Sequence, residues 1–250
     1  MPILEIKELM VFYENALAVN NFSMRVDEGE IVGVLGPNGA GKSTLMYAIS
    51  GLLLDRQIKE ERRGGERITI LGEIAFNGEE ITREKASDRV KRGIVLCMER
   101  HPVFPESSVL ENLRTGGYLR RRPEVRERLD YVFELFPALV RLKRQAAGFL
   151  SGGEQQMLAI GTALVARPSL LLLDEPLLGL SPAIQAKLVE AIQRIRDETG
   201  IAILIAEQYA RPVLPIIDRG YVLENGTVTF SGTGEELMEN PDMRAAYFGV

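Results

Sequence analysis

Cysteine, histidine and long apolar runs are nearly absent from this sequence. Its one cysteine, Cys97, cannot form an internal disulfide, which suits a reducing cytosol. Apolar runs such as LLLL at 170–173 are far shorter than the roughly 20 residues that span a bilayer. The N-terminal MPILEIKEL alternates apolar and charged residues, unlike a signal peptide. We therefore expect a cytoplasmic protein whose membrane role, if it has one, goes through a partner.

An excess of positive charge is also missing. The formal net charge is −5 and the pI is about 5.3, which argues against a nucleic-acid-binding protein that relies on overall positive charge. With 250 residues, of which 46% are hydrophobic, the chain can bury one sizeable core. A single domain, residues 1–250, is the expectation.

The pattern of segments favours an α/β fold with antiparallel edges. Residues 3–13 alternate like an edge strand, 22–30 form another strand, and 30–36 form a buried strand that a helix follows. Asn-Gly pairs at 77–78 and 225–226 predict tight hairpin turns. The strands at 169–175 and 201–207 flank a helix with Ser181 at the N-cap, Pro182 at N1 and Gly200 at its end. These two strands are expected to be parallel and close in one sheet.

Residues 102–150 contain no convincing strand, and the stretch 124–136 has the apolar spacing of a helix. From 114 to 144 there are nine basic residues against four acidic ones, which form either a solvated surface or a docking surface. We expect a helical subdomain at about 99–154, inserted into a core made of 1–98 and 155–250. The charged segment 55–67, with its Gly-Gly pair, is expected to be a long exposed loop.

The run GPNGAGKS at 36–43 matches the phosphate-binding loop G-x-x-x-x-G-K-[ST] and lies between a predicted strand and a predicted helix. Glycines let backbone N–H groups approach phosphate oxygens, Lys42 supplies positive charge, and the Ser43 hydroxyl can bind Mg²⁺. The strand LLLLDE then ends in Asp174 and Glu175. One carboxylate near Mg²⁺ and a second directed at water are what hydrolysis of a γ-phosphate needs. The two motifs together predict a nucleoside triphosphatase that uses Mg²⁺.

LSGGEQQ at 150–156 precedes the Asp-Glu strand by about 20 residues. Ser151 and Glu154 satisfy a capping box, so a good helix start is the simple interpretation. Gly152 and Gly153 are poor helix formers, however, and they leave the helix N-terminus open to an anion. With the other two motifs, this segment resembles the ATP-binding cassette (ABC) family over essentially the whole chain.

The resemblance implies a P-loop NTPase cassette with a mainly parallel core sheet, an antiparallel β subdomain and the inserted helical subdomain. It also implies a dimer in which Ser151, Gly152, Gly153 and Glu154 act on the ATP of a second ABC ATPase subunit, whether identical or a sister chain. Catalysis is assigned to Glu175, Lys42, Gln208 and Glu99, and the metal to Ser43, Asp174 and Glu99. The nucleotide-binding residues are Tyr13, the adenine-stacking aromatic, and Gly36, Pro37, Asn38, Gly39, Ala40, Gly41, Lys42, Ser43 and Thr44.

Departures from the common pattern narrow the resemblance. Glu99 stands where the family has a glutamine, Ser181 where it often has an aspartate, and Gln208 where its switch histidine is expected. These residues are similar to the ATPase subunits of importers for branched-chain and other hydrophobic amino acids. Such a subunit would bind transmembrane permease subunits at the inner face of the membrane. A separate solute-binding protein would deliver the solute to the permease, and no nucleic acid would be bound. The alternatives are an ATPase for urea or short amides, a soluble non-transport cassette, and a non-hydrolysing nucleotide-binding module.

The segment ILIAEQ at 203–208 ends in an acid and an amide. We expect Gln208 to lie beside the Asp174–Glu175 strand and to orient the γ-phosphate and the attacking water without titrating; a simple polar strand end is the alternative. His101 is expected at the surface or at the permease interface rather than in catalysis.

Overall fold

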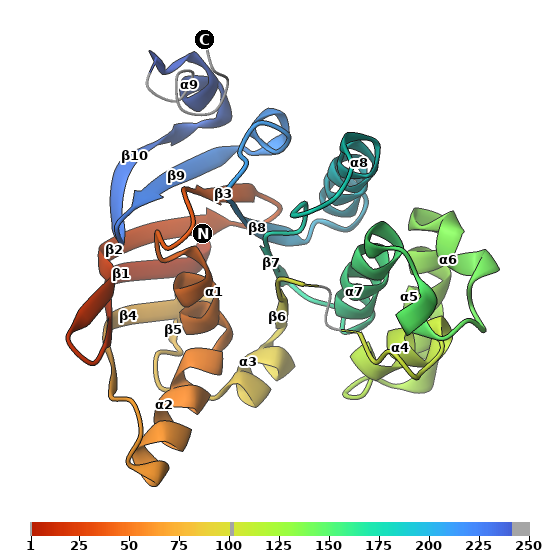
Figure 1. Cartoon of the computed structure of the whole chain (residues 1–250), viewed down its shortest axis with the longest axis horizontal. Helices are drawn as coiled ribbons and strands as arrows, with labels where there is room; N and C mark the ends of the chain where they lie inside the picture. The colour runs from red at the N-terminus through yellow and green to blue at the C-terminus, as the bar shows by residue number, and fades with distance from the viewer. Residues whose placement is uncertain (1, 101–102, 242–250) are drawn as a thin grey trace.

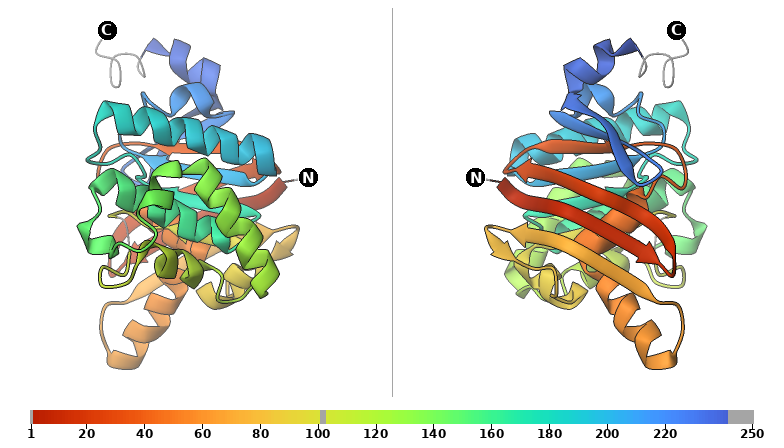
Figure 2. Two further views of the ribbon diagram at one scale, coloured as in Figure 1. Left: turned by 90° about the vertical axis from the view of Figure 1, so that its right-hand side faces the viewer. Right: turned by 90° about the vertical axis from the view of Figure 1, so that its left-hand side faces the viewer.

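The computed structural model describes residues 2–100 and 103–241. They form a sheet of mainly parallel strands, an antiparallel sheet, and helices between and beside the two (Figure 1). The antiparallel sheet and the group of helices α4–α7 lie on opposite sides of the molecule (Figure 2). The predicted fold class, an α/β cassette with a mainly parallel core and an antiparallel part, is confirmed.

The core sheet has the strand order β10-β9-β3-β8-β7-β6, in which all neighbours are parallel except the β9–β10 pair. Its strands are β3 (Ile31–Leu35), β6 (Ile94–Cys97), β7 (Leu170–Asp174), β8 (Ala202–Glu207), β9 (Arg219–Glu224) and β10 (Thr227–Thr233). In β7, Leu170 and Leu172 pack toward the antiparallel sheet, while Leu171 and Leu173 belong to the core on the side of α7 and α8. Because both faces are covered, the strand is a continuous apolar run.

The antiparallel sheet has the order β2-β1-β4-β5. Its strands are β1 (Pro2–Tyr13), β2 (Ala16–Asp27), β4 (Ile68–Phe76) and β5 (Glu79–Glu80). The prediction that 3–13 is an edge strand is wrong, since β1 pairs with β2 on one side and β4 on the other. Its alternation reflects one buried face rather than a free edge. The two predicted hairpin turns are confirmed, and both residues of each Asn-Gly pair have positive φ.

Helix α1 (Lys42–Ser50) lies between the two sheets, and α2 (Leu52–Arg63) follows directly (Figure 1). The expectation of a long loop at 55–67 is therefore wrong for most of that segment. Its charged residues are good helix formers, Leu53 and Leu54 are buried on one side, and Gly64 ends the helix in a left-handed conformation. High polarity suggested a loop, although it only marks the exposed side of an amphipathic helix.

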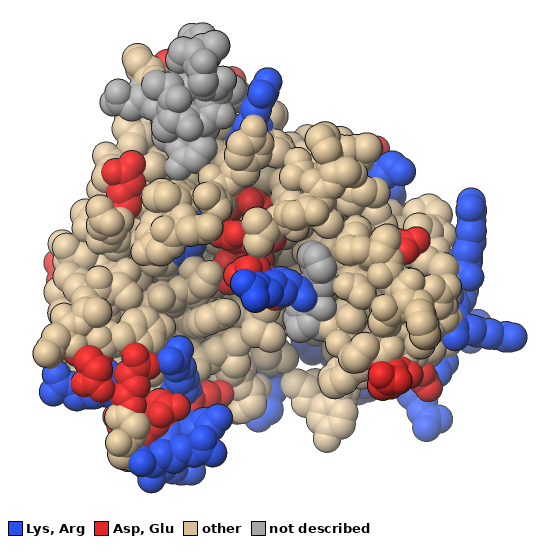
Figure 3. Space-filling view, viewed as in Figure 1, with Lys and Arg blue, Asp and Glu red and all other residues tan. Residues whose placement is uncertain are grey.

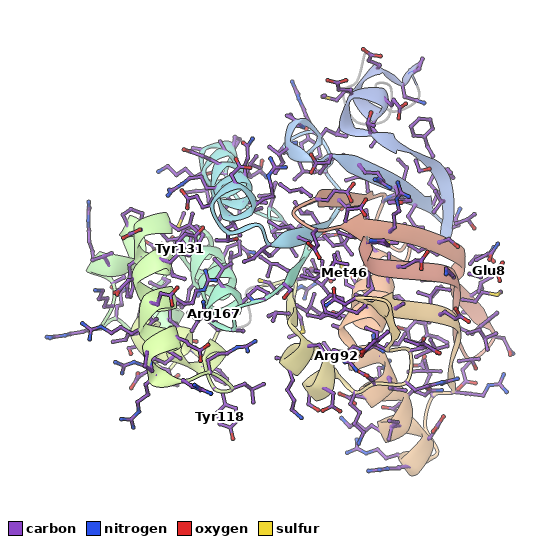
Figure 4. All side chains as sticks on the ribbon, turned by 180° about the vertical axis from the view of Figure 1, so that it is seen from behind. Glu8, Met46, Arg92, Tyr118, Tyr131 and Arg167 are labelled. Carbon is purple, nitrogen blue, oxygen red and sulfur yellow. The ribbon has the colours of Figure 1, made fainter. Side chains whose placement is uncertain are left out.

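The predicted helical region is confirmed. It contains α4 (Val109–Gly116), α5 (Arg122–Leu135), α6 (Pro137–Arg141) and the 3₁₀ turn η1 (Ala147–Phe149), and α7 (Gly152–Val165) packs against them. Arg167, just after α7, forms ion pairs with Glu124 and Glu127 of α5 (Figure 4). The inserted region is thereby held to the helix that leads back into the core sheet.

Helix α8 (Pro182–Thr199) runs between β7 and β8, which are adjacent and parallel as predicted. Ser181 is its N-cap residue, although the side chain makes no capping hydrogen bond, and Gly200 is its C-cap. The remaining elements are α3 (Ala86–Arg92), the turn η2 (Leu214–Ile216) and α9 (Gly234–Glu239). Among the described residues, no helix has the length and apolar character needed to cross a membrane.

Candidate functional site

The glycine-rich run 36–41 connects the end of β3 to the start of α1. Gly41 has a φ of 104°, and a Cβ at this position would lie 2.4 Å from the carbonyl oxygen of Ala18, so only glycine fits. Lys42 and Ser43 begin α1, where the positive end of the helix dipole and free N–H groups favour an anion. The local structure therefore has the form that the motif predicts.

Lys42 is buried, and its ammonium group is fully engaged. Its Nζ donates to the carbonyl oxygens of Gly36 at 2.9 Å and Pro37 at 3.1 Å, and lies 3.0 Å from Oε1 of Glu175. The ion pair joins the phosphate-binding loop after β3 to the acidic end of β7. Two predicted catalytic residues from distant parts of the sequence are thus in contact.

Ser43 and Asp174 are also in contact, because the Ser43 hydroxyl donates to Oδ1 of Asp174 at 3.2 Å. The other carboxylate oxygen of Asp174 is buried and has no hydrogen-bond partner among the described residues. Burial, with smaller contributions from Glu175 and Glu99, raises the pKa of Asp174 to about 6. A buried oxygen without a partner beside a hydroxyl fits Mg²⁺, which prefers oxygen ligands and retains several waters or phosphate oxygens. No group of three or more acidic, cysteine or histidine side chains suited to a metal occurs among the described residues.

A cavity of about 440 Å³ opens beside these groups. Near the middle of the face drawn in Figure 3, acidic side chains gather, with a basic side chain in front of them. Glu99 comes from the segment after β6, and its carboxylate pairs with Arg100 at 3.1 Å. The cavity is lined by Ala18, Asn38, Gly39, Gly41, Lys42, Ser43, Thr44, Glu99, Arg100, Glu175 and Leu178. The structure thus brings together most of the predicted loop residues and two of the three acids.

Tyr13 and residues 151–154 at the start of α7, called the signature residues below, lie elsewhere. Tyr13 ends β1, and the Arg56 guanidinium lies 5.3 Å from its ring centroid. At the start of α7, the Ser151 hydroxyl accepts from the backbone N–H of Glu154, which confirms the capping box. Neither Tyr13 nor residues 151–154 line the cavity beside Lys42. Within one chain, the signature helix does not contribute to this cavity.

Gln208 follows β8 directly and is half-buried. Because β8 is the neighbour of β7, Gln208 lies beside the Asp174–Glu175 strand as predicted. It does not line the cavity, and its role remains a prediction. His101 lies outside the described residues. Glu207 has no role predicted from the sequence, but its carboxylate accepts from the backbone N–H of Leu177 at 2.9 Å. The position of Glu207 next to Gln208, at the end of an apolar strand, is the sequence feature that could have indicated a role for it.

A phosphate-binding loop on a parallel sheet, an Asp-Glu pair beside its lysine and a capped helix after an inserted helical region define a P-loop NTPase cassette. The family model described as "ABC transporter" matches residues 19–178. The chain belongs to this family and is one of its ATPase cassettes.

Two curated relatives and one solved structure illustrate the similarity. The chain is 39% identical to the high-affinity branched-chain amino acid transport ATP-binding protein BraG of Pseudomonas aeruginosa, over 98% of this chain and 99% of the relative. It is 36% identical to the probable branched-chain amino acid transport ATP-binding protein LivF of Archaeoglobus fulgidus, over 90% and 89%. An ATP-binding cassette of an ABC transporter in its ADP conformation has a TM-score of 0.81 and 27% identity, with 100% of both chains covered.

Proposed function

We propose that the chain hydrolyses ATP in the cavity beside Lys42 and that Glu175 acts on the attacking water. The observation that carries this proposal is the pair of contacts beside the cavity: Lys42 with Glu175 at 3.0 Å and Ser43 with Asp174 at 3.2 Å. They place a cation and two carboxylates where the ends of β3 and β7 meet a helix N-terminus. Ser151 and Gly152, which are exposed at the start of α7, would supply the second anion-binding surface, for the ATP of a partner subunit.

Each residue then has a defined role. Phosphate oxygens compete with Glu175 for the Lys42 ammonium group, which leaves the Glu175 carboxylate free to orient water and to accept its proton. Attack on the γ-phosphorus breaks its bond to the bridging oxygen and releases ADP and phosphate. Ser43 and Asp174, with Glu99, would hold Mg²⁺, which neutralises phosphate charge. Gln208 contacts the γ-phosphate or the water, and Tyr13 stacks on adenine.

The decisive experiment compares phosphate release by the wild-type chain and by Glu175→Gln, with ATP and Mg²⁺. The amide keeps the shape of the side chain but accepts no proton, so turnover should fall at least 100-fold while ATP remains bound. Size-exclusion chromatography with ATP should then show Glu175→Gln as a stable dimer. A Glu175→Gln variant that stays monomeric and hydrolyses at the wild-type rate would exclude this role for Glu175.

We further propose that this hydrolysis energises the import of branched-chain or other hydrophobic amino acids. The similarity to BraG and LivF along nearly the whole chain supports this substrate class. In that arrangement, two cassettes bind transmembrane permease subunits at the inner face of the membrane, and a separate solute-binding protein supplies the amino acid. Proteoliposomes that contain the co-purified permease should take up leucine, isoleucine or valine when ATP is present. Uptake of urea or acetamide instead would contradict the amino-acid assignment.

A further inference from the structure

The backbone of Glu175 is held in an unusual conformation. Its φ is 47°, in the left-handed region that glycine adopts easily and other residues rarely do. The residue donates its N–H to the carbonyl oxygen of Ala206 at 2.9 Å and accepts at its own carbonyl from the N–H of Leu178 at 3.2 Å. A strained conformation persists only where the surroundings enforce it. The contacts that hold the following loop, residues 176–181, therefore help to set the direction of the Glu175 side chain.

The peptide groups of Leu177 are held from both sides. Its N–H donates to Oε1 of Glu207 at 2.9 Å, and its carbonyl oxygen accepts from Nε2 of Gln185, on α8, at 3.1 Å. Leu177 and Glu207 are each 2% exposed, so water does not compete for the bond between them. Two side chains from two elements thus fix the middle of the turn that begins at Glu175.

Glu207 also reaches the phosphate-binding loop. Its carbonyl oxygen accepts from the N–H of Gly36 at 3.2 Å, and its carboxylate is hydrogen-bonded by the N–H of Tyr209. Residue 207 therefore connects the loop that begins at Gly36, the loop that carries Glu175 and the segment that contains Gln208. Its place at the end of β8, between β3 and β7, makes this possible.

A buried carboxyl group at this point would be costly if it served only for packing. Burial, with a smaller contribution from the Glu175 carboxylate, raises the pKa of Glu207 to about 8, although the N–H groups of Leu177 and Tyr209 and the charge of Lys42 lower it. A protonated Glu207 still accepts from Leu177 through its carbonyl oxygen and does not repel Glu175. A glutamine side chain would reproduce both properties.

We propose that Glu207 is a positioning residue for ATP hydrolysis. By holding the N–H of Leu177, it keeps Glu175 in its left-handed conformation beside Lys42, and Gln185 provides the second hold on the same loop. This inference rests on the proposed function, in which Glu175 acts on the attacking water.

The test compares Glu207→Leu, Glu207→Gln and Gln185→Leu with the wild type, and Glu190→Leu, an exposed acid of α8, is the matched control. Leucine has a similar volume but accepts no hydrogen bond. For Glu207→Leu we expect kcat to fall 10-fold or more, while KM and the affinity for a fluorescent ATP analogue stay within threefold. Glu207→Gln should retain kcat within threefold of wild type, Gln185→Leu should lose three- to tenfold, and Glu190→Leu should be unchanged.

Hydrogen–deuterium exchange of the peptide that covers 175–181 provides a readout that does not require turnover. Glu207→Leu should exchange faster there than wild type, and Glu207→Gln should not; if Glu207→Leu does not fold, Gln185→Leu takes its place in both assays. A hydrolysing wild type whose Glu207→Leu and Gln185→Leu variants match it in kcat would overturn the positioning role alone. Absence of hydrolysis by the wild type would overturn the proposed function, and the positioning role of Glu207 with it.

Discussion

Arg89 is a fully buried arginine, with 1% of its surface exposed, and it should contribute strongly to stability. The side chain comes from α3 and forms no ion pair with any residue in the described part of the chain. Burial lowers the pKa of its guanidinium to about 10. All five of its N–H groups donate to backbone carbonyl oxygens, at distances of 2.6–3.1 Å, those of Ala48, Ile49, Ile81, Thr82 and Glu84. Arg89 thereby caps the C-terminal end of α1, the helix that begins with Lys42.

Replacing Arg89 with methionine keeps an unbranched apolar stem and removes all five donors. A hydrogen bond to a charged group is worth about 1.5–3 kcal/mol. Two of the acceptors, the carbonyls of Ala48 and Ile81, keep a second donor in Gly51 and Glu84. Because methionine also removes the desolvation cost of burying a cation, a further part of the lost stability is offset. We therefore expect a net cost of about 3–5 kcal/mol. For a chain of this size that is a fall in Tm of roughly 6–20 °C.

Arg92, on the same helix, is the matched control. Its side chain is 35% exposed and pairs with Glu79 and Glu84 at the surface (Figure 4). Arg92→Met should therefore cost much less stability than Arg89→Met, because solvent screens exposed ion pairs. Thermal unfolding followed by circular dichroism measures both variants. Arg89→Lys, with three donors for five acceptors, should recover less than half of the loss. If Arg89→Met melts within 2 °C of wild type, water replaces the guanidinium and the reasoning is refuted.

Three further predictions concern the site. Gly152→Asp places a carboxylate at the exposed start of α7, so ATP hydrolysis should be abolished while a fluorescent ATP analogue still binds at 36–43; loss of both would indicate misfolding. Gln208→Ala should slow hydrolysis about 30- to 1000-fold, whereas Gln208→His should retain activity and add an inflection near pH 6.5 to the pH–rate profile. If Gln208→Ala hydrolyses ATP at the wild-type rate, Gln208 has no role in the chemical step. Because the folded pKa of Glu207, beside Glu175 and Lys42, lies above its ordinary value, the folded state holds a proton that the unfolded chain loses. Urea unfolding should show wild-type stability falling by roughly 4 kcal/mol from pH 4.5 to pH 8 relative to Glu207→Gln, and parallel curves would exclude this titration.

Gly152 is a better position than Gly153 for the signature variant. A Cβ at Gly153 would lie 2.8 Å from Cγ2 of Ile184 on α8, whereas at Gly152 the nearest atom is 3.8 Å away. A loss of activity in Gly153→Asp would therefore combine electrostatic repulsion with a packing defect. The exposed position separates the two effects.

The parts of the fold that could be predicted from sequence are those with local signals. Asn-Gly turns, the N- and C-terminal signals of α8 and the phosphate-binding loop each depend on a few neighbouring residues, and all have the expected conformation. The helix α2 was missed because a charged amphipathic helix and a charged loop have similar compositions. Arg89 was missed for a related reason: its carbonyl partners come from 48–49 and 81–84, and no local pattern marks an arginine as buried.

The site depends on a non-local fact, the order β3-β8-β7 in the core sheet. The βαβ pattern predicted that β8 would lie beside β7, but it did not indicate that β8 also borders β3. Since the carboxyl ends of parallel strands share one edge, a side chain at the end of β8 must lie between the phosphate-binding loop and the loop that carries Glu175. An apolar strand that ends there in Glu207 and Gln208 therefore brings two polar residues to this edge of the sheet. Glu207 is turned inward to the loop after Glu175, and Gln208 is the one left half-exposed. In our proposal the two residues have different tasks: Glu207 holds the loop that follows Glu175, and Gln208 contacts the γ-phosphate or the attacking water.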